Sequence, residues 1–310
     1  MTNIYNFIIN KPLGWLLNQL SILVGNDFAM AIILFTILVN VLLVPLNIKT
    51  QKSTAKQAKL KPRLDVIKKK CGTDKAKYQT EMRQLYADEN VSMAGGCLPT
   101  VVRLLVMIGV YTVIRSPLTY LSGISSTVVT AAREACLPLT GKAALKSVTQ
   151  LDVISHIDSL KESFPQIFQK AGDLNFNLFG IDLTQSPTFS LNIFKGFEAI
   201  WIIPIFAFSA AMLTSIITVI TQKKVNPDAP NTSAIMLSMP LMSLFIAFTV
   251  PGAVGFYWGC SSLISGLIQF AMQLLYSPAR LISTDYSKAV LVRYKDEQAR
   301  IKKHSLGETK

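Results

Sequence analysis

The chain has 310 residues, of which 50% are hydrophobic and only 16% are charged, and its mean hydropathy is +0.39. A soluble domain normally carries about a quarter charged residues, so this composition argues against a soluble protein and indicates a polytopic membrane protein. The net charge of +13 is concentrated in particular segments, and its placement therefore carries information about orientation in the membrane.

Residues 1–25 are expected to form an amphipathic helix that lies in the outer membrane interface. Apolar residues recur at helical spacing after Pro12, and Trp15 suits the headgroup region. The segment has neither the basic start nor the unbroken apolar core of a signal peptide. A membrane-spanning anchor is the alternative interpretation.

Five apolar runs approach or reach the roughly 17–25 residues that a spanning helix needs. They predict an all-α protein with five transmembrane helices. The fourth run is the shortest and suits a tilted helix or a locally thinned bilayer. The expected spans are 28–48, 97–117, 199–222, 235–250 and 254–275.

The basic segment 49–95 is expected to form an antiparallel helical hairpin. Apolar residues repeat at helical spacing in two stretches, and Gly72 and Asp74 between them supply a helix-ending glycine and an N-cap. The loop from Lys49 to Gly96 carries 12 Lys or Arg against 5 acidic residues. Such a surface can meet anionic lipid, ribosomal RNA or acidic proteins, although a merely solvated basic loop is the alternative.

The positive-inside rule orients the chain. The 49–95 hairpin, the 223–234 loop and the basic 277–310 tail are expected in the cytoplasm, which places the N-terminus outside. The neutral segment 118–196 is then an outer loop with a small helical cap, because Leu151, Ile154, Ile157 and Leu160 share one helical face.

Polar residues at membrane depth predict a hydrated groove entered from the cytoplasm. Arg103 lies about one turn inside the second span, where an unpartnered arginine costs about 2.5–3.5 kcal/mol. Asn40 lies at comparable depth in the first span. The alternatives are that Arg103 snorkels to the interface and that the hydroxyls only satisfy helix backbones. The predicted groove residues are Arg103, Asn40, Thr36, Thr214, Thr218, Ser262, Ser265 and Gln269.

Basic residues of the first hairpin helix form a predicted recruitment surface, and two histidines in the whole chain make a histidine-based metal centre improbable. We expect no metal or organic cofactor. The predicted recruitment residues are Lys56, Lys59, Lys61, Arg63, Lys68, Lys69 and Lys70.

The order of these features resembles the YidC family of membrane protein insertases and its mitochondrial and chloroplast relatives. The matching motifs are Val44-Pro45-Leu46 with Gln51-Lys52-Ser53, Lys61-Pro62, Leu85-Tyr86, Gly95-Gly96-Cys97-Leu98-Pro99, Asp182-Leu183-Thr184 with Pro187, Pro251-Gly252 and Tyr257-Trp258. The resemblance covers nearly the whole of residues 1–280 and leaves the middle of the outer segment unaccounted for. The resemblance is to the Gram-positive-like form, without a large periplasmic domain.

The resemblance implies five spans, a cytoplasmic coiled hairpin, and a groove open to cytoplasm and lipid but closed outside. In the family a positively charged residue of the first span attracts the polar or acidic outer part of the client protein. This chain has Asn40 at that position, and Arg103 where the family commonly has glutamine. We therefore hypothesise that the charge has moved to the neighbouring helix.

The expected function is to insert and help fold membrane proteins at the cell membrane, without a chemical step. The expected partners are nascent membrane proteins and the lipid bilayer, with the ribosome and the Sec translocon as open candidates and no DNA. A small-solute transporter or channel is the alternative, although no Asp or Glu lies within the five expected spans. An intramembrane enzyme is disfavoured because those spans carry no carboxylate or histidine for acid–base chemistry.

Overall fold

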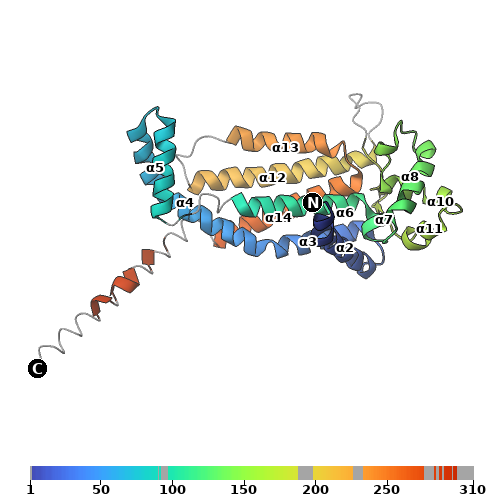
Figure 1. Cartoon of the computed structure of the whole chain (residues 1–310), viewed down its shortest axis with the longest axis horizontal. Coiled ribbons are helices and arrows are strands. Elements are labelled where there is room, and N and C mark those ends of the chain that lie inside the picture. Colours follow the sequence, from blue (N-terminus) through green and yellow to red (C-terminus); the bar gives the residue numbers. More distant parts are fainter. Residues whose placement is uncertain are drawn as a thin grey trace, which may run out of the picture. The chain divides into compact units, whose positions relative to one another are not determined.

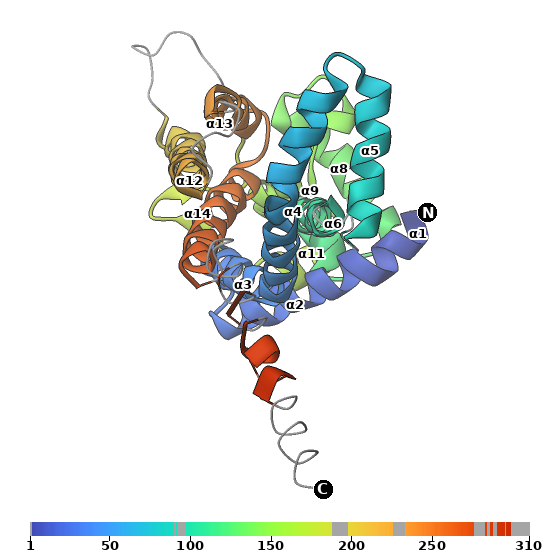
Figure 2. The same ribbon diagram turned by 90° about the vertical axis from the view of Figure 1, so that its left-hand side faces the viewer.

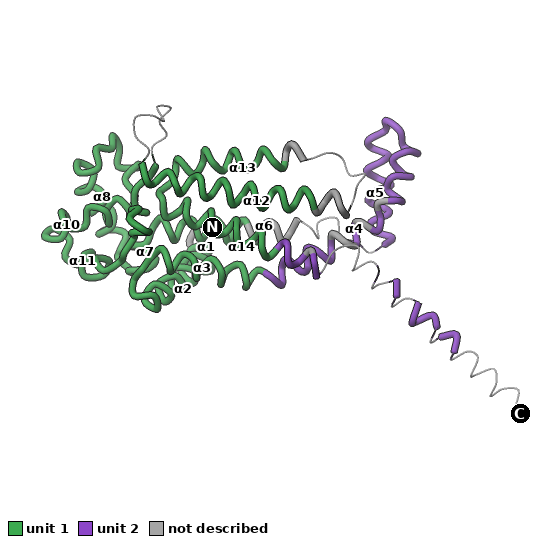
Figure 3. Tube along the Cα trace, turned by 180° about the vertical axis from the view of Figure 1, so that it is seen from behind, with its two compact units in different colours: residues 1–43, 102–268 green, residues 44–101, 269–310 purple. Residues whose placement is uncertain are grey.

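The computed structural model describes residues 2–89, 91, 97–187, 198–225 and 233–275, together with tail residues 283, 286–287, 290–294 and 296–298. The predicted 223–234 loop and 277–310 tail therefore fall mostly outside the described residues. The chain divides into two compact units, coloured separately in Figure 3: residues 1–43 with 102–268, and residues 44–101 with 269–310.

The first unit begins with consecutive helical segments, α1 (Thr2–Tyr5), the π-helix η1 (Asn6–Asn10) and α2 (Lys11–Leu23). Helical structure thus starts before Pro12, which occupies the first turn of α2. Small residues allow close packing here: a side chain at Gly109 would meet Ile9, and one at Gly14 would meet Tyr120. Trp15 remains 63% exposed.

The next helix, α3 (Phe28–Leu42), is capped by the side chain of Asp27, which accepts a hydrogen bond from the Met30 N–H. It ends at Leu42 with Leu43 as its C-cap, and α4 (Val44–Cys71) begins directly afterwards. The helix expected over 28–48 is therefore interrupted. Pro45 accounts for the break, because proline lacks a backbone donor and restricts the residue before it.

Four more apolar helices follow, and most of their residues belong to the first unit. They are α6 (Cys97–Arg115), α12 (Ile202–Val225), α13 (Ser233–Ala247) and α14 (Gly252–Leu275), and the 3₁₀ turn η4 (Ala199–Trp201) leads into α12. Among the described residues, Ala199–Ile220 is the single helix long and apolar enough to cross a membrane. Phe28–Leu42 and Val44–Ser53 meet that criterion as a pair.

Helices α12 and α13 run side by side (Figure 1). Glycines bring α14 close to α12, because a side chain at Gly259 would meet Phe206 and one at Gly266 would meet Thr214. The Thr214 hydroxyl donates to the Ser262 carbonyl across this contact at 3.0 Å. Small residues and hydroxyls at helix interfaces are the usual means of packing helices within a membrane.

Residues 117–185 form a separate layer of short elements at the ends of these helices. Cys136 of α8 is fully buried and its thiol donates to the Asp152 carbonyl; burial raises the pKa of this thiol. Of the predicted face, Leu151, Ile154 and Leu160 are buried and Ile157 is half-buried, but the helix is divided at His156. The elements are α7 (Pro117–Tyr120), α8 (Ser126–Thr140), η3 (Leu145–Ser147), α9 (Gln150–Ser155), α10 (Ile157–Leu160), α11 (Pro165–Ala171), β1 (Asn177–Leu178) and β2 (Ile181–Asp182).

This layer satisfies the backbone donors at the starts of two apolar helices. The Phe28 N–H of α3 donates to Asn175 at 2.8 Å, and the Gly252 N–H of α14 donates to Gln185 at 2.7 Å. The next donor of α14, at Ala253, reaches Leu183 at 2.7 Å. The first N–H groups of a helix have no partner within the helix, so these bonds fix the layer to the bundle.

The second unit contains α4 and α5 (Lys75–Asp88), which lie side by side in Figure 2. Gly72 adopts a positive φ of 53° in the turn, and the Asp74 side chain caps α5 by accepting from Lys77. Ion pairs join Lys70 to Glu81 near the turn and Arg63 to Glu89 farther from it. The sequence separation of the two pairs shows that the helices are antiparallel.

Candidate functional site

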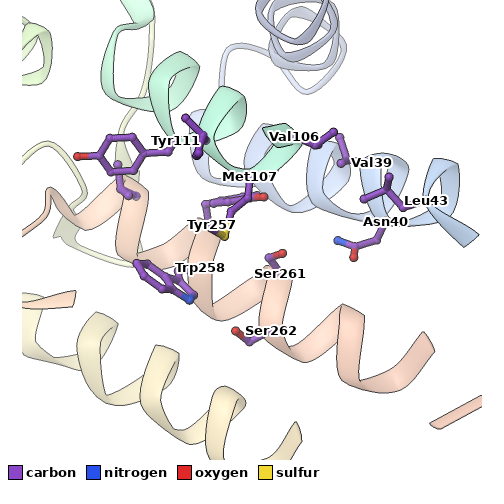
Figure 4. A pocket seen from close by; sticks show the side chains of 12 residues that line it. Val39, Asn40, Leu43, Val106, Met107, Tyr111, Tyr257, Trp258, Ser261 and Ser262 are labelled. Atoms are coloured by element: carbon purple, nitrogen blue, oxygen red, sulfur yellow. The ribbon is translucent and has the colours of Figure 1, made fainter. Parts of the chain in front are cut away.

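A cavity of about 270 Å³ lies within the first unit, between α3, α6 and α14 (Figure 4). Each helix contributes residues from one face, because the positions recur three or four apart. The lining residues are Val39, Asn40 and Leu43 of α3; Val106, Met107, Ile108 and Tyr111 of α6; and Val254, Tyr257, Trp258, Ser261 and Ser262 of α14.

Asn40 is the most constrained polar residue of this lining. It is only 7% exposed, its amide donates to the Thr36 carbonyl at 2.9 Å, and its side-chain oxygen accepts from the Ser265 hydroxyl at 2.8 Å. The second bond joins α3 to α14 directly. Asn40 therefore both borders the cavity and fixes one of its walls.

Ser261 and Ser262 lie on the cavity face of α14, and Figure 4 shows them across the cavity from Met107. Tyr257 and Trp258 precede them by one turn each and line the same space. The cavity thus combines hydroxyl, amide and aromatic polar groups with apolar side chains, and can accept hydrogen-bonding groups of a ligand without being charged along its described lining.

The structure brings together only part of the predicted groove set. Asn40 and Ser262 line the cavity. Thr36 is fully buried and donates to Ile32 at 2.6 Å, and Thr218 donates to Thr214 at 2.8 Å. These hydroxyls are bonded to helix backbones, which is the alternative that the sequence left open for them.

Two other predicted groove residues, Arg103 and Gln269, are not among the described residues that line the cavity. Arg103 lies in α6, four residues before Met107, but its side chain is outside the described residues. Gln269 belongs to the second unit. Thr214 and Ser265 instead take part in bonds between α14 and the neighbouring helices.

Four polar or aromatic lining residues were missed by the sequence prediction: Tyr111, Tyr257, Trp258 and Ser261. On α14 a signal exists, because residues 254, 257, 258, 261 and 262 follow the spacing of one helical face. The prediction chose Ser262, Ser265 and Gln269, which continue along the same side of α14, and of these three Ser262 lines the cavity.

The predicted recruitment residues lie on α4, in the second unit. Six of them are exposed: Lys56, Lys59, Arg63, Lys68, Lys69 and Lys70; the side chain of Lys61 is outside the described residues. Arg63 and Lys70 pair with acidic residues of α5. Lys68 and Lys69 lie beside these pairs and make the turn end of the helix strongly positive.

A mostly helical chain whose apolar helices surround a partly polar cavity is consistent with an α-helical membrane protein. Comparison with known protein families narrows this class to one family. The model of the 60Kd inner membrane protein family matches residues 19–278, and the chain belongs to that family.

Individual relatives match a shorter stretch. The membrane protein insertase YidC of Neisseria meningitidis serogroup B is 45% identical over 101 residues, 33% of this chain and 18% of the relative. The YidC of Aromatoleum aromaticum is 41% identical over 107 residues, covering 34% and 19%. That of Dinoroseobacter shibae is 37% identical over 108 residues, covering 35% and 18%. The matched stretches thus span less than a fifth of these relatives' length.

Proposed function

We propose that this chain is a membrane protein insertase that integrates membrane proteins and helps them fold. The observation that carries the proposal is the cavity between α3, α6 and α14, where Asn40, Ser261 and Ser262 present polar groups among apolar helices. Membership of the 60Kd inner membrane protein family and the names of the YidC relatives support it.

The proposed topology has five spans, with the N-terminus outside and the C-terminus in the cytoplasm. The 49–95 hairpin then lies in the cytoplasm, the 118–196 segment outside, and α2 in the outer interface. The asymmetry of charge supports this arrangement, since the 49–96 loop has 12 basic and 5 acidic residues. The break at Leu43 would separate the membrane part of the first span from the hairpin.

In the proposed mechanism, the polar outer segment of a client protein enters the cavity from the cytoplasm. Moving an unpaired polar group from water into hydrocarbon costs several kcal/mol. Amide and hydroxyl groups of the cavity lower this cost by hydrogen bonding. The client's apolar segment then enters lipid along α12 and α14, driven by burial of its apolar side chains. No covalent step is involved.

Arg103 is proposed to supply the attraction for acidic client segments. It precedes the lining residues Val106 and Met107 by one helical turn, so helical spacing puts these positions on the same side of α6. A cation in the family position on the first span would be absent, because that residue is Asn40. The charge would act from α6 instead.

The exposed cations of α4 are proposed to recruit the ribosome or its nascent chain. Lys68 and Lys69 are exposed and follow one another at the turn end of α4, where they add to the positive charge of the hairpin. Such a surface attracts anionic phosphates, and the attraction weakens with salt. The Sec translocon is a second candidate partner for this surface.

The proposal is tested by reconstituting the purified protein into liposomes and adding a small single-span client with an acidic outer tail. Protection of that tail from external protease scores insertion. We expect insertion to depend on the protein, with no accompanying ion flux. Ion flux without insertion would instead assign the cavity to a small-solute transporter or channel.

A further inference from the structure

A second, more apolar cavity lies elsewhere in the first unit, at the start of α12. Its volume is about 380 Å³. The β1–β2 hairpin forms one wall through Leu178, Phe179 and Ile181, and Ile202 and Phe206 of α12 form another. Phe256 of α14 also lines the cavity. None of the described lining residues has an ionisable side chain.

The tip of the β1–β2 hairpin presents an aromatic ring in an unusual backbone conformation. Phe179 is 99% exposed and has a φ of 51°, and Gly180 follows with a φ of 87°. Two positive φ values in a two-residue loop define a type I′ turn, which favours Asn, Asp or Gly at its first position. The Asn177 side chain supports the turn by accepting from the Gly180 N–H at 2.7 Å.

The residues around this cavity indicate that it faces lipid and not water. Ile202, which lines it, is 48% exposed, and Ile205 one turn along α12 is 46% exposed. Both belong to Ala199–Ile220, the described helix that is by itself long and apolar enough to cross a membrane. The cavity is therefore continuous with the apolar outer surface of that helix, which acyl chains would cover.

We propose that this cavity binds one acyl chain of a membrane phospholipid and that Phe179 inserts into the lipid beside it. Recognition is by burial of apolar surface, since the lining offers no charge for a headgroup. A fully exposed phenylalanine in a turn that disfavours it is stabilised when lipid covers the ring. The inference requires α12 to cross the membrane and does not require insertase activity.

The test uses the full chain in vesicles of phosphatidylethanolamine and phosphatidylglycerol, doped with a phospholipid that carries a diazirine within its acyl chain. Illumination and mass spectrometry then locate the adducts. We expect them to concentrate on residues 178–181 and 199–206. In Ala199→Trp, which fills the cavity, adduct yield falls about fivefold or more, since a filled cavity leaves no room for the chain. The control Leu213→Trp, on the exposed surface of α12, retains them.

Phe179→Gly and Phe179→Asn remove the aromatic ring but keep the turn, because both residues tolerate a positive φ. We expect thermal stability to hold or rise while adducts on 178–181 fall. Adducts spread evenly along α12, or unchanged by Ala199→Trp, would overturn the proposal. Because the lipid experiment contains no client, its failure is distinct from failure of the insertion assay.

Discussion

The cavity-lining helices and the α4–α5 hairpin use their polar residues in opposite ways. In the bundle, Thr36, Thr218 and Asn40 bond to backbone carbonyls of their own helices, and few polar groups remain to face the cavity. On the hairpin, Lys68 and Lys69 extend from an exposed helix surface. The bundle therefore depends on the exact rotation of each helix, whereas the hairpin depends mainly on the number and placement of its charges.

The largest effect is expected from filling the cavity. Ser261→Trp places an indole in a space of about 270 Å³, so insertion should fall on the order of tenfold, or ~1.4 kcal/mol. The reconstituted insertion assay measures it. Ser209→Trp, at an exposed position of α12, is the matched control. Equal insertion by the two variants would contradict a role for the cavity.

A smaller effect is expected from removing the charge on α6. Arg103→Ala should lower insertion of a client with an acidic tail about three- to tenfold, since a hydrated ion pair contributes ~1 kcal/mol. Arg103→Lys should retain most of the activity, and a client with an uncharged polar tail should respond little. A similar loss for both clients would show that Arg103 acts on folding and not through its charge.

The hairpin should respond to charge removal in proportion to the charges lost. The double variant Lys68→Gln with Lys69→Gln should weaken ribosome binding roughly two- to fivefold. It should also reduce the slope of the logarithm of the binding constant against the logarithm of salt concentration by about one per lysine. Sedimentation with ribosomes at several salt concentrations measures both. Lys161→Gln with Lys170→Gln, in the 118–196 segment, is the control, and a matching loss there would remove the hairpin's specific role.

The smallest effect is expected from the bond between α3 and α14. Ser265→Ala removes the hydroxyl that donates to Asn40, which should lower the free energy of unfolding by ~0.6 kcal/mol. Unfolding in mixed micelles measures it. Ser209→Ala should leave stability unchanged. No difference between the two variants would show that this bond does not hold the cavity wall.

Local sequence signals account for the turn between α4 and α5. The glycine and the capping carboxylate at Gly72 and Asp74 act within a few residues, so the turn and the start of α5 can be read from spacing alone. The break at Leu43 also has a local cause in Pro45, although the prediction continued the helix to residue 48.

The part of α14 that borders the cavity could not be predicted in the same way, because it depends on what packs against each turn of the helix. Gly259 and Gly266 bring α14 against Phe206 and Thr214, which turns Ser261 toward the cavity and leaves Ser265 to bond with Asn40. Ser261 and Ser265 are four residues apart on one side of α14, so spacing alone does not tell which of them borders the cavity. Packing, which involves residues distant in sequence, selects one of them.

The most direct test of the proposed function is photocrosslinking of a client arrested during insertion. A photoreactive amino acid replaces Ser261 in the cavity or Ile216, which is 41% exposed on α12. The account predicts that the client's polar outer tail crosslinks to position 261 and that its apolar segment crosslinks to position 216. A tail that crosslinks equally to both positions, or never to 261, would contradict the claim that the cavity receives it.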